Sequence, residues 1–474
     1  MAGRFAVRAV AGLAVLAVAV VVPAVPAAAQ AAAGGQGAGA PAGQRGPTRL
    51  AVQAGPGAAA RHWVTGWSAS STTAARDASG CPAFSGLHDQ TVRTVTTVSA
   101  GGSEVRIDVT NRFGTVPLHV GRATVAVRGE AADAVPGTMR QLTFHGHREA
   151  TIPAGASMRS DPVDLAVPAL QQLAVSVYLP DATGPVTQHP WGRSGAYLAS
   201  GDRAGDPAAT GYQVSSCSMF TDRVELRATG RAAGPAAGGA MGPAAGRAMG
   251  PAAGGAMGPA ASRAMGTVVT LGDSITDGTT SVRGTIFSWP DELARRLAGR
   301  PGRTLSVANA GISGNEVLVD RIPVQYGESA LHRLDRDVFR VTGVRTMILL
   351  EGINDIGADS ATAAQLIAAD RQIVAAAHAR GIRVVGATLT PFAGSTTKFG
   401  GDYGTAYGDA QRRALNDWIR TGGAFDAVVD FDRVVADPAD PSRMLPAYDS
   451  GDHLHPGTAG YQAMGDAIDL SELT

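Results

Sequence analysis

The stretch "TVVTLGDSITDGTTS" at residues 267–281 starts as an apolar, β-branched run and then changes to small and polar residues. The run at 267–271 predicts a buried β-strand, and Ser274 follows it after two residues. A turn accounts for the glycine between them. It does not account for the polar clusters "GIND" (352–355) and "DHLH" (452–455), which also follow strand-like runs. Together these clusters indicate a site built from several strand ends.

Residues 266–474 alternate between apolar, strand-like runs and helical patterns. The predicted strands are 267–271, 305–310, 345–350, 383–389 and 426–431. The predicted helices include 289–299, 361–380, 405–421 and 457–469. Strands that alternate with helices predict a parallel, doubly wound α/β sheet. In such sheets, sites form beyond the carboxyl ends of the strands, which is where the polar clusters lie.

The residue types in these clusters suit nucleophilic acyl transfer. A serine hydroxyl such as that of Ser274 is a weak nucleophile until a neighbouring imidazole takes its proton. Asp452 and His455 are three residues apart, a spacing that lets the carboxylate orient the imidazole. The oxyanion that forms needs preorganised donors. We expect these to be the backbone N–H groups of Ser274 and Gly314 and the side-chain amide of Asn354.

With these residues in view, the chain resembles the SGNH, or GDSL, hydrolase superfamily. The blocks "GDSITDG", "GISGN", "GIND" and "DHLHP" occur in family order. The resemblance covers 266–474 and implies a three-layer α/β/α sandwich with a flavodoxin-like sheet. It also implies ester hydrolysis without a metal or cofactor. The residues to which the family roles carry over are Ser274, Gly314, Asn354, Asp452 and His455.

Three alternatives remain open at these positions. Gly311 competes with Gly314 as the glycine of its block, and His453 competes with His455, although only His455 has the D-x-x-H spacing from Asp452. A metal site is the third alternative, and it would make the protein a metal-dependent phosphoesterase. Its candidate ligands are Asp273, Asp277, Asp355 and His453.

Residues 61–230 have the pattern of a β-rich domain of the sandwich or jelly-roll type, with alternating segments separated by Gly, Pro and Asp turns. The segments are 104–113, 123–129, 173–180 and 222–230. The stretches "GGSEVRIDVTNRFG" and "LTFHG" are similar to those of exported actinobacterial members of the superfamily. That resemblance implies that the β-rich domain packs against the hydrolase domain. Trp63 and Trp67 are expected to be core or edge aromatics, with sugar stacking as the alternative.

The remaining segments predict export and a flexible connection. Residues 1–29 have the basic start, apolar run and small-residue end of a signal peptide, so we expect secretion and no stable membrane anchor after cleavage. Residues 30–60 read as a disordered lead. At 231–265 a Gly-Pro-Ala-Met octapeptide recurs, which predicts a linker.

The chain has two cysteines, Cys81 and Cys217. An even pair in an exported chain predicts a disulfide, and the absence of a C-x-x-C motif argues against a redox site.

The 40 basic residues equal the 40 acidic residues, so charge gives no case for nucleic acid as a partner. The sequence thus predicts a secreted serine esterase whose substrate is an acylated glycan, an aryl ester or a lipid. A glycan-binding protein with an inert hydrolase domain is the rival from another class. The oligomeric state is not predicted.

Overall fold

The computed structural model describes residues 62–74, 76–77, 80–190, 195–228, 262–280, 288–321 and 326–474. All of them belong to one unit, Gly57–Thr474. The predicted signal peptide (1–29), the lead (30–60) and residues 231–261 of the predicted linker lie outside the described residues.

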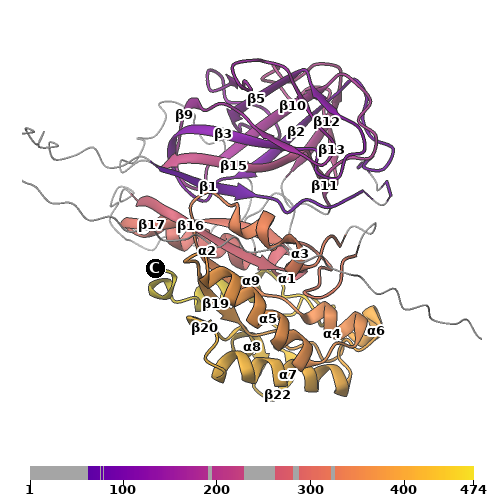
Figure 1. Ribbon diagram of the computed structural model, residues 1–474, viewed down its shortest axis with the longest axis vertical. Coiled ribbons are helices and arrows are strands. Elements are labelled where there is room, and N and C mark those ends of the chain that lie inside the picture. The colour runs from indigo at the N-terminus through magenta and orange to yellow at the C-terminus, as the bar shows by residue number, and fades with distance from the viewer. Residues whose placement is uncertain are drawn as a thin grey trace, which may run out of the picture. The chain divides into compact units, whose positions relative to one another are not determined.

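A five-stranded parallel sheet organises the C-terminal region, in the order β17-β16-β18-β19-β20 (Figure 1). Its strands are β16 (Ser262–Gly272), β17 (Gly302–Gly311), β18 (Val344–Leu350), β19 (Arg383–Ala387) and β20 (Ala427–Val429). Counted along this region the order is 2-1-3-4-5, the order of flavodoxin-like sheets. The α/β prediction is therefore confirmed. The first strand begins earlier than predicted, because Ser262 already pairs with Gly302, so pairing extends into the stretch predicted as linker (231–265).

Helices connect these strands. They are α1 (Ser274–Asp277), α2 (Trp289–Gly299), α3 (Ala330–Leu334), α4 (Ile353–Asp359), α5 (Ala363–His378), α6 (Thr396–Phe399), α7 (Ala406–Thr421), α8 (Phe431–Val435) and α9 (Thr458–Ala467). A π-helical turn, η1 (Asp335–Phe339), a 3₁₀ turn, η2 (Leu470–Leu473), and a hairpin of β21 (Ala436–Asp437) and β22 (Asp440–Met444) complete the region.

Local sequence explains why α2 begins where it does. The Ser288 hydroxyl accepts the N–H of Asp291, and the Asp291 carboxylate accepts the N–H of Ser288, which forms a capping box. Trp289, Leu293 and Leu297 then recur at helical spacing and are buried in the core. Such a cap followed by an apolar stripe is readable from sequence, and the predicted bounds match.

Two antiparallel sheets form the N-terminal region, which confirms the β-rich prediction. One sheet contains β1 (His62–Ser68), β15 (Thr221–Ala228), β3 (Gly102–Thr110), β8 (Ser157–Arg159) and β9 (Val163–Val167). The other contains β13 (Gln213–Ser215), β12 (Ala196–Ser200), β2 (Gln90–Thr97), β10 (Gln172–Leu179), β5 (Arg122–Val127) and β6 (Arg140–Gln141). Two small pairs join β11 (Gln188–His189) to β14 (Ser218–Met219) and β4 (Leu118–Val120) to β7 (Ala150–Ile152). Side chains from both large sheets share one hydrophobic core, as Ile107 of β3 and Val175 of β10 illustrate.

The β-rich region contacts the α/β region directly through β1, which lies at the edge of its own sheet next to β16 and β17 (Figure 1). The N–H of Thr65 donates to the carbonyl of Thr342 (3.1 Å), and the Ser68 hydroxyl donates to the carbonyl of Asn309 (2.8 Å). These contacts cover an edge strand that would otherwise present unpaired backbone groups. The packing implied by the family resemblance is therefore present in the structure.

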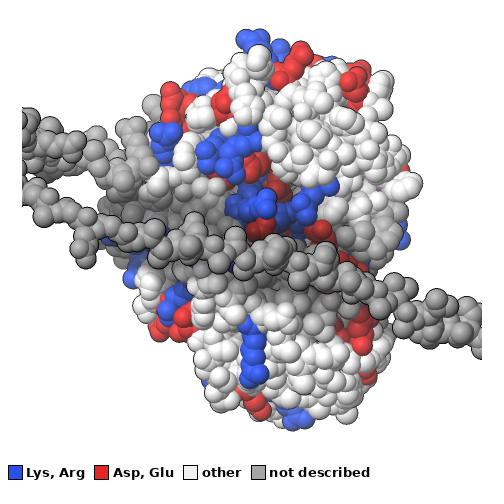
Figure 2. Space-filling model, in the orientation of Figure 1, with Lys and Arg blue, Asp and Glu red and all other residues white. Residues whose placement is uncertain are grey.

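Charge is mixed on the face shown in Figure 2, where basic and acidic side chains lie next to one another. Among the described residues, no helix is long and apolar enough to cross a membrane. Trp63 carries the guanidinium groups of Arg106 and Arg227 over its ring, at 4.1 and 5.1 Å from the centroid. These contacts stabilise the sheet surface through cation–π attraction.

Cys81 and Cys217 form the predicted disulfide, with a Cα–Cα distance of 5.7 Å. The bond joins residues 136 positions apart, so it removes much conformational freedom from the unfolded chain. We expect the double variant Cys81→Ala/Cys217→Ala to lose about 2–5 kcal/mol of unfolding free energy. Chemical denaturation with and without reductant measures this loss. The wild type should be sensitive to reductant and the double variant insensitive, whereas equal unfolding midpoints in all four samples would contradict the expectation.

Candidate active site

Ser274 lies on a sharp turn directly after β16. The carboxylate of Asp273 accepts the N–H of Ile275 (2.8 Å) and so caps the short helix that Ser274 begins. Ser274 is largely buried in this turn. The local sequence thus fixes the hydroxyl at the carboxyl edge of the sheet, where binding sites of doubly wound folds form.

A continuous chain of hydrogen bonds runs from Asp452 through His455 to Ser274. Nδ1 of His455 lies 2.7 Å from Oδ2 of Asp452, and its Nε2 lies 2.8 Å from Oγ of Ser274. Because a carboxylate only accepts hydrogen bonds, the ring proton lies on Nδ1 and leaves Nε2 to accept the serine proton. This is the arrangement in which an imidazole can act as a general base toward a serine.

Asp452 is held as an anion in a buried position. Burial alone would raise the pKa of its carboxyl group, but hydrogen bonds from the ring and backbone of His455 and from the N–H of Leu454 outweigh that effect. The pKa of Asp452 therefore lies well below its usual range. A permanent negative charge at this place orients the ring and stabilises an imidazolium when one forms.

His453 forms a second His–Asp pair two residues away. Its Nδ1 lies 2.6 Å from Oδ2 of Asp449, and its side chain is 48% exposed. The structure thus gives both competing histidines a carboxylate partner, but it places His455 against Ser274.

A cavity of about 630 Å³ opens over Ser274. Its walls include Ser274, Asp277, Thr279, Ser313, Gly314, Glu316, Arg321, Tyr326, Asn354, Phe399, Tyr403, Leu454 and His455. All of the predicted nucleophile, base and oxyanion-donor residues therefore border one space.

The two competing glycines differ in their surroundings. Gly314 borders the cavity with φ +81°, and a Cβ there would lie 2.3 Å from the ring of Tyr326. Gly311 instead packs under α1, where a Cβ would lie 2.2 Å from the backbone nitrogen of Asp277. Both positions require glycine, but of the two it is Gly314 that borders the cavity.

The side chain of Asn354 is fixed by two hydrogen bonds. Its Nδ2 donates to the carbonyl of Asn315 (2.8 Å), and its Oδ1 accepts the hydroxyl of Tyr403 (2.7 Å). An amide nitrogen carries two N–H groups, so one remains to donate toward a ligand. Sequence reasoning missed Tyr403, which lies in a Gly-rich loop with no motif around it.

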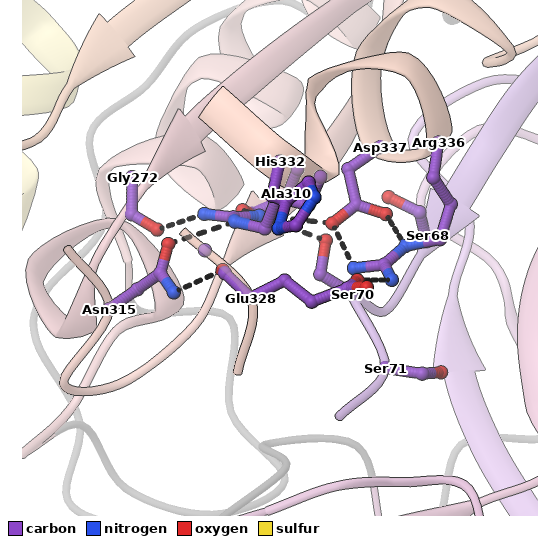
Figure 3. Close-up of polar contacts among 12 residues, drawn as sticks. Ser68, Ser70, Ser71, Gly272, Ala310, Asn315, Glu328, His332, Arg336 and Asp337 are labelled. Atoms are coloured by element: carbon purple, nitrogen blue, oxygen red, sulfur yellow. Dashed lines mark hydrogen bonds and ion pairs between the residues drawn. The ribbon is translucent and has the colours of Figure 1, made fainter. Parts of the chain in front are cut away.

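Sequence reasoning also missed a buried arginine, Arg333, which joins the strand ends; Figure 3 labels its partners Gly272, Ala310, Asn315 and Asp337. Arg333 has no exposed surface and donates to the carbonyls of Gly272 (3.0 Å) and Ala310 (2.6 Å) and to the side chain of Asn315 (2.9 Å). It thereby joins the ends of β16 and β17 to the loop that follows β17. Asp337 balances its charge at 3.1 Å.

Several acidic side chains are buried near Arg333. Burial raises the pKa of Asp273 to about 7 and that of Asp355 to about 6, and it raises the pKa of Glu351 well above the ordinary value. The carboxylate of Asp355 accepts the backbone N–H groups of Val317 and Leu318, both at 2.9 Å. It therefore holds the loop after β17, as expected for an acidic residue that supports a turn.

The candidate metal ligands Asp273, Asp277, Asp355 and His453 each have separate protein partners. Among the described residues, no group of three or more His, Cys, Asp or Glu side chains is arranged to hold a metal ion.

Residues 270–463 match the sequence model of the GDSL-like lipase/acylhydrolase family. No curated protein matches the chain at a significant level. Among solved structures, a GDSL-like lipase from Bacteroides thetaiotaomicron has 21% identity and a TM-score of 0.32, and the match covers 44% of this chain and 88% of that one. An aryl esterase of M. smegmatis has 16% identity and a TM-score of 0.33, with coverage of 43% and 95%.

The family match spans the turn of Ser274, the loop of Gly314, the helix of Asn354 and the Asp452–His455 loop. Residues 270–463 therefore form an ester hydrolase domain of the GDSL-like lipase/acylhydrolase family.

Proposed function

We propose that this protein is an exported serine esterase that hydrolyses carboxylic esters through an acyl-enzyme. The observation that carries the proposal is the hydrogen-bonded chain from Asp452 through His455 to Ser274, which ends at a cavity. Its disulfide supports export, since such bonds persist in oxidising compartments.

In the proposed first half-reaction, Oγ of Ser274 attacks the ester carbonyl carbon while its proton passes to Nε2 of His455. The tetrahedral oxyanion accepts hydrogen bonds from the N–H groups of Ser274 and Gly314 and from the amide of Asn354. The carbon–oxygen bond to the alcohol then breaks, and the departing alkoxide takes the proton from His455.

In the second half-reaction, a water molecule attacks the acyl-enzyme and gives its proton to His455. The bond to Oγ breaks, the serine regains its proton from His455, and the carboxylic acid leaves. Asp452 orients the ring and stabilises the imidazolium in both halves.

The walls of the cavity favour short acyl groups and polar or aryl alcohols. Glu316 and Arg321 form an ion pair in the wall, and burial raises the pKa of Glu316 to about 7. A long alkyl chain packed against the part-exposed guanidinium of Arg321 would remove it from water without replacing its hydrogen bonds to water, which is costly. Tyr326, Phe399 and Tyr403 supply flat apolar surface for an aryl group or a sugar.

A panel of p-nitrophenyl esters from acetate to palmitate tests the proposal. We expect kcat/KM to be highest for the shortest chains and to be unchanged by a chelator, because no proposed step uses a metal ion. Bis-p-nitrophenyl phosphate serves as the contrasting substrate. Hydrolysis of the phosphodiester that stops with chelator, together with no ester hydrolysis, would favour the metal-dependent rival.

A further inference from the structure

A buried histidine of the β-rich region contacts the turn that carries Ser274. His189 lies in β11 and is 7% exposed. Its Nε2 is 3.1 Å from Oδ1 of Asp277, and its Nδ1 is 2.8 Å from the carbonyl oxygen of Ser70. Asp277 ends helix α1 and borders the cavity. A residue from outside the α/β region is thus joined to the wall of the active site.

The partners of His189 decide how many protons its ring carries. A carbonyl oxygen and a carboxylate both accept hydrogen bonds, so each ring nitrogen must donate. A neutral imidazole has a single N–H and would leave one nitrogen facing an acceptor without a proton. His189 therefore needs both ring protons, as in an imidazolium, to satisfy both acceptors. It differs in this from His455, whose Nε2 faces a hydroxyl group that can donate.

The ion pair of His189 and Asp277 continues into the loop after β17. The other oxygen of Asp277 accepts the hydroxyl of Ser313 at 2.6 Å, and Ser313 lies 2.9 Å from the hydroxyl of Thr279. Ser313 directly precedes Gly314 in the chain. A displacement of the Asp277 carboxylate would therefore displace Ser313. Ser313 is bonded to Gly314, whose N–H is an oxyanion donor in the proposed function.

We propose that His189, as an imidazolium, is a positioning residue for ester hydrolysis: it holds Asp277, and through Ser313 it fixes the loop of Gly314. This inference rests on the proposed function. It joins the β-rich region to the catalytic centre, because the imidazolium that contacts Asp277 comes from β11.

The fold holds His189 rigidly. On one side of β11, Gln188 exchanges two backbone hydrogen bonds with Thr72. On the other side, His189 is paired with Ser218 of β14. Cys217, one of the two disulfide cysteines, directly precedes Ser218. The disulfide therefore braces the short strand pair that presents His189.

The same geometry predicts a pH dependence. Burial lowers the pKa of His189, and the charge of Arg333 lowers it slightly further. Asp277 and the carbonyl of Ser70 together raise it more, so the net shift is upward. A raised pKa means that the ion pair is fully formed below the ordinary histidine value, about 6.5. It is lost as the pH rises through the raised value. The turnover of the wild type should therefore fall on the alkaline side.

Steady-state kinetics of His189→Ala on p-nitrophenyl acetate test the positioning role. We expect kcat to fall about 10–100-fold, because a small displacement of a reacting group has effects of this size, while KM changes little. His119→Ala is the matched control. His119 pairs with Asp181 at 2.9 Å in the same region, but it is partly exposed and is not among the residues that line the cavity. Its removal should leave kcat unchanged.

The variant Asp277→Asn removes the negative charge of residue 277 but keeps a side chain of nearly the same size and shape. An asparagine in this place can donate from Nδ2 to Nε2 of a neutral His189 and accept from Ser313 with Oδ1, so no imidazolium is needed. The alkaline fall in kcat should disappear in this variant. Retention of the same alkaline fall would show that His189 does not cause it.

¹⁵N NMR of ¹⁵N-histidine-labelled Ser274→Ala protein measures the protonation of the His189 ring nitrogens directly and needs no enzymatic activity. The same spectrum of a protein that also carries His189→Ala assigns the signal. Two protonated ring nitrogens at pH 7 are expected. A neutral ring, or an unchanged kcat in His189→Ala, would overturn the inference. An imidazolium in a wild-type protein that hydrolyses no ester would instead overturn the proposed function.

Discussion

Replacing Ser274 with alanine is expected to lower kcat for ester hydrolysis by at least about 10⁴-fold. The physical reason is that the substitution removes the atom that would bond to the acyl carbon. The Oγ of Ser274 is 2.8 Å from Nε2 of His455, so the hydroxyl has the base it needs. The residual rate would come from the oxyanion donors and from substrate binding, which the alanine leaves in place.

The measurement combines turnover of p-nitrophenyl acetate with labelling by a fluorophosphonate probe, which reacts covalently with an activated serine. The wild type should take up one probe per chain, on Ser274, and Ser274→Ala should take up none. Ser313→Ala is a matched control, because Ser313 also borders the cavity but bonds to Asp277 and not to His455. It should still take up one probe per chain, although more slowly, because Ser313 also holds the loop of Gly314. Full labelling of Ser274→Ala would disprove the mechanism.

The main elements of the α/β region were predictable because the local pattern of apolar residues indicates which segments are buried. A parallel strand that is covered on both faces is a continuous apolar run, and β18 is such a run from Thr346 to Leu350, all buried. The predicted range 289–299 matches α2, whose apolar stripe is buried after a cap at Ser288. In contrast, strands of two or three residues, such as β6 and β11, are too short to show a period.

The start of β16 shows a different limit. Residues 262–265 end the fourth octapeptide repeat, "GPAASRAM" (258–265), of the predicted linker, and nothing local marks them as a strand. They extend the sheet because β17 begins early enough to pair with them, from Gly302 onward. Pairing with a distant segment therefore overrides local propensity here.

For the candidate site, the motif residues were predictable, but the residues that hold them in place by hydrogen bonds were not. Ser274 and His455 lie in short blocks with defined spacing, so each block could be read alone. His189 and Asp277 are 88 residues apart, and Tyr403 and Asn354 are 49 apart. No spacing rule relates such partners, since the folded chain alone brings them together. A histidine in a β-rich stretch therefore carried no signal of its contact with the active-site turn.

The paired histidines of the last loop allow the sharpest test of the proposed base. Both have a carboxylate on Nδ1, at 2.7 Å for His455 and 2.6 Å for His453. They differ in their surroundings. Nε2 of His455 contacts Ser274 and the residue is buried, whereas the side chain of His453 is 48% exposed. The same substitution at the two positions thus isolates the contact with the nucleophile.

Asparagine is the suitable replacement at both positions. His453 has φ +64°, in the left-handed region, and asparagine tolerates that region better than most residues. At 455 an asparagine can still bond to Asp452, but it cannot take a proton from a serine at neutral pH. We expect His455→Asn to lower kcat by about 10⁴–10⁶-fold. His453→Asn should retain nearly all activity and lose at most about 1 kcal/mol of stability, as expected for an exposed pair.

Reaction with the fluorophosphonate probe gives an independent measure of the same difference, because that reaction also needs an activated serine. The labelling rate of Ser274 should fall steeply in His455→Asn and stay near the wild-type rate in His453→Asn. Thermal melts of the two variants exclude unfolding as the cause, since both substitutions lie in the same loop. If His453→Asn were the inactive variant and His455→Asn remained active, the proton would have to leave Ser274 by another route. The 2.8 Å contact between Ser274 and His455 would then have no role in catalysis.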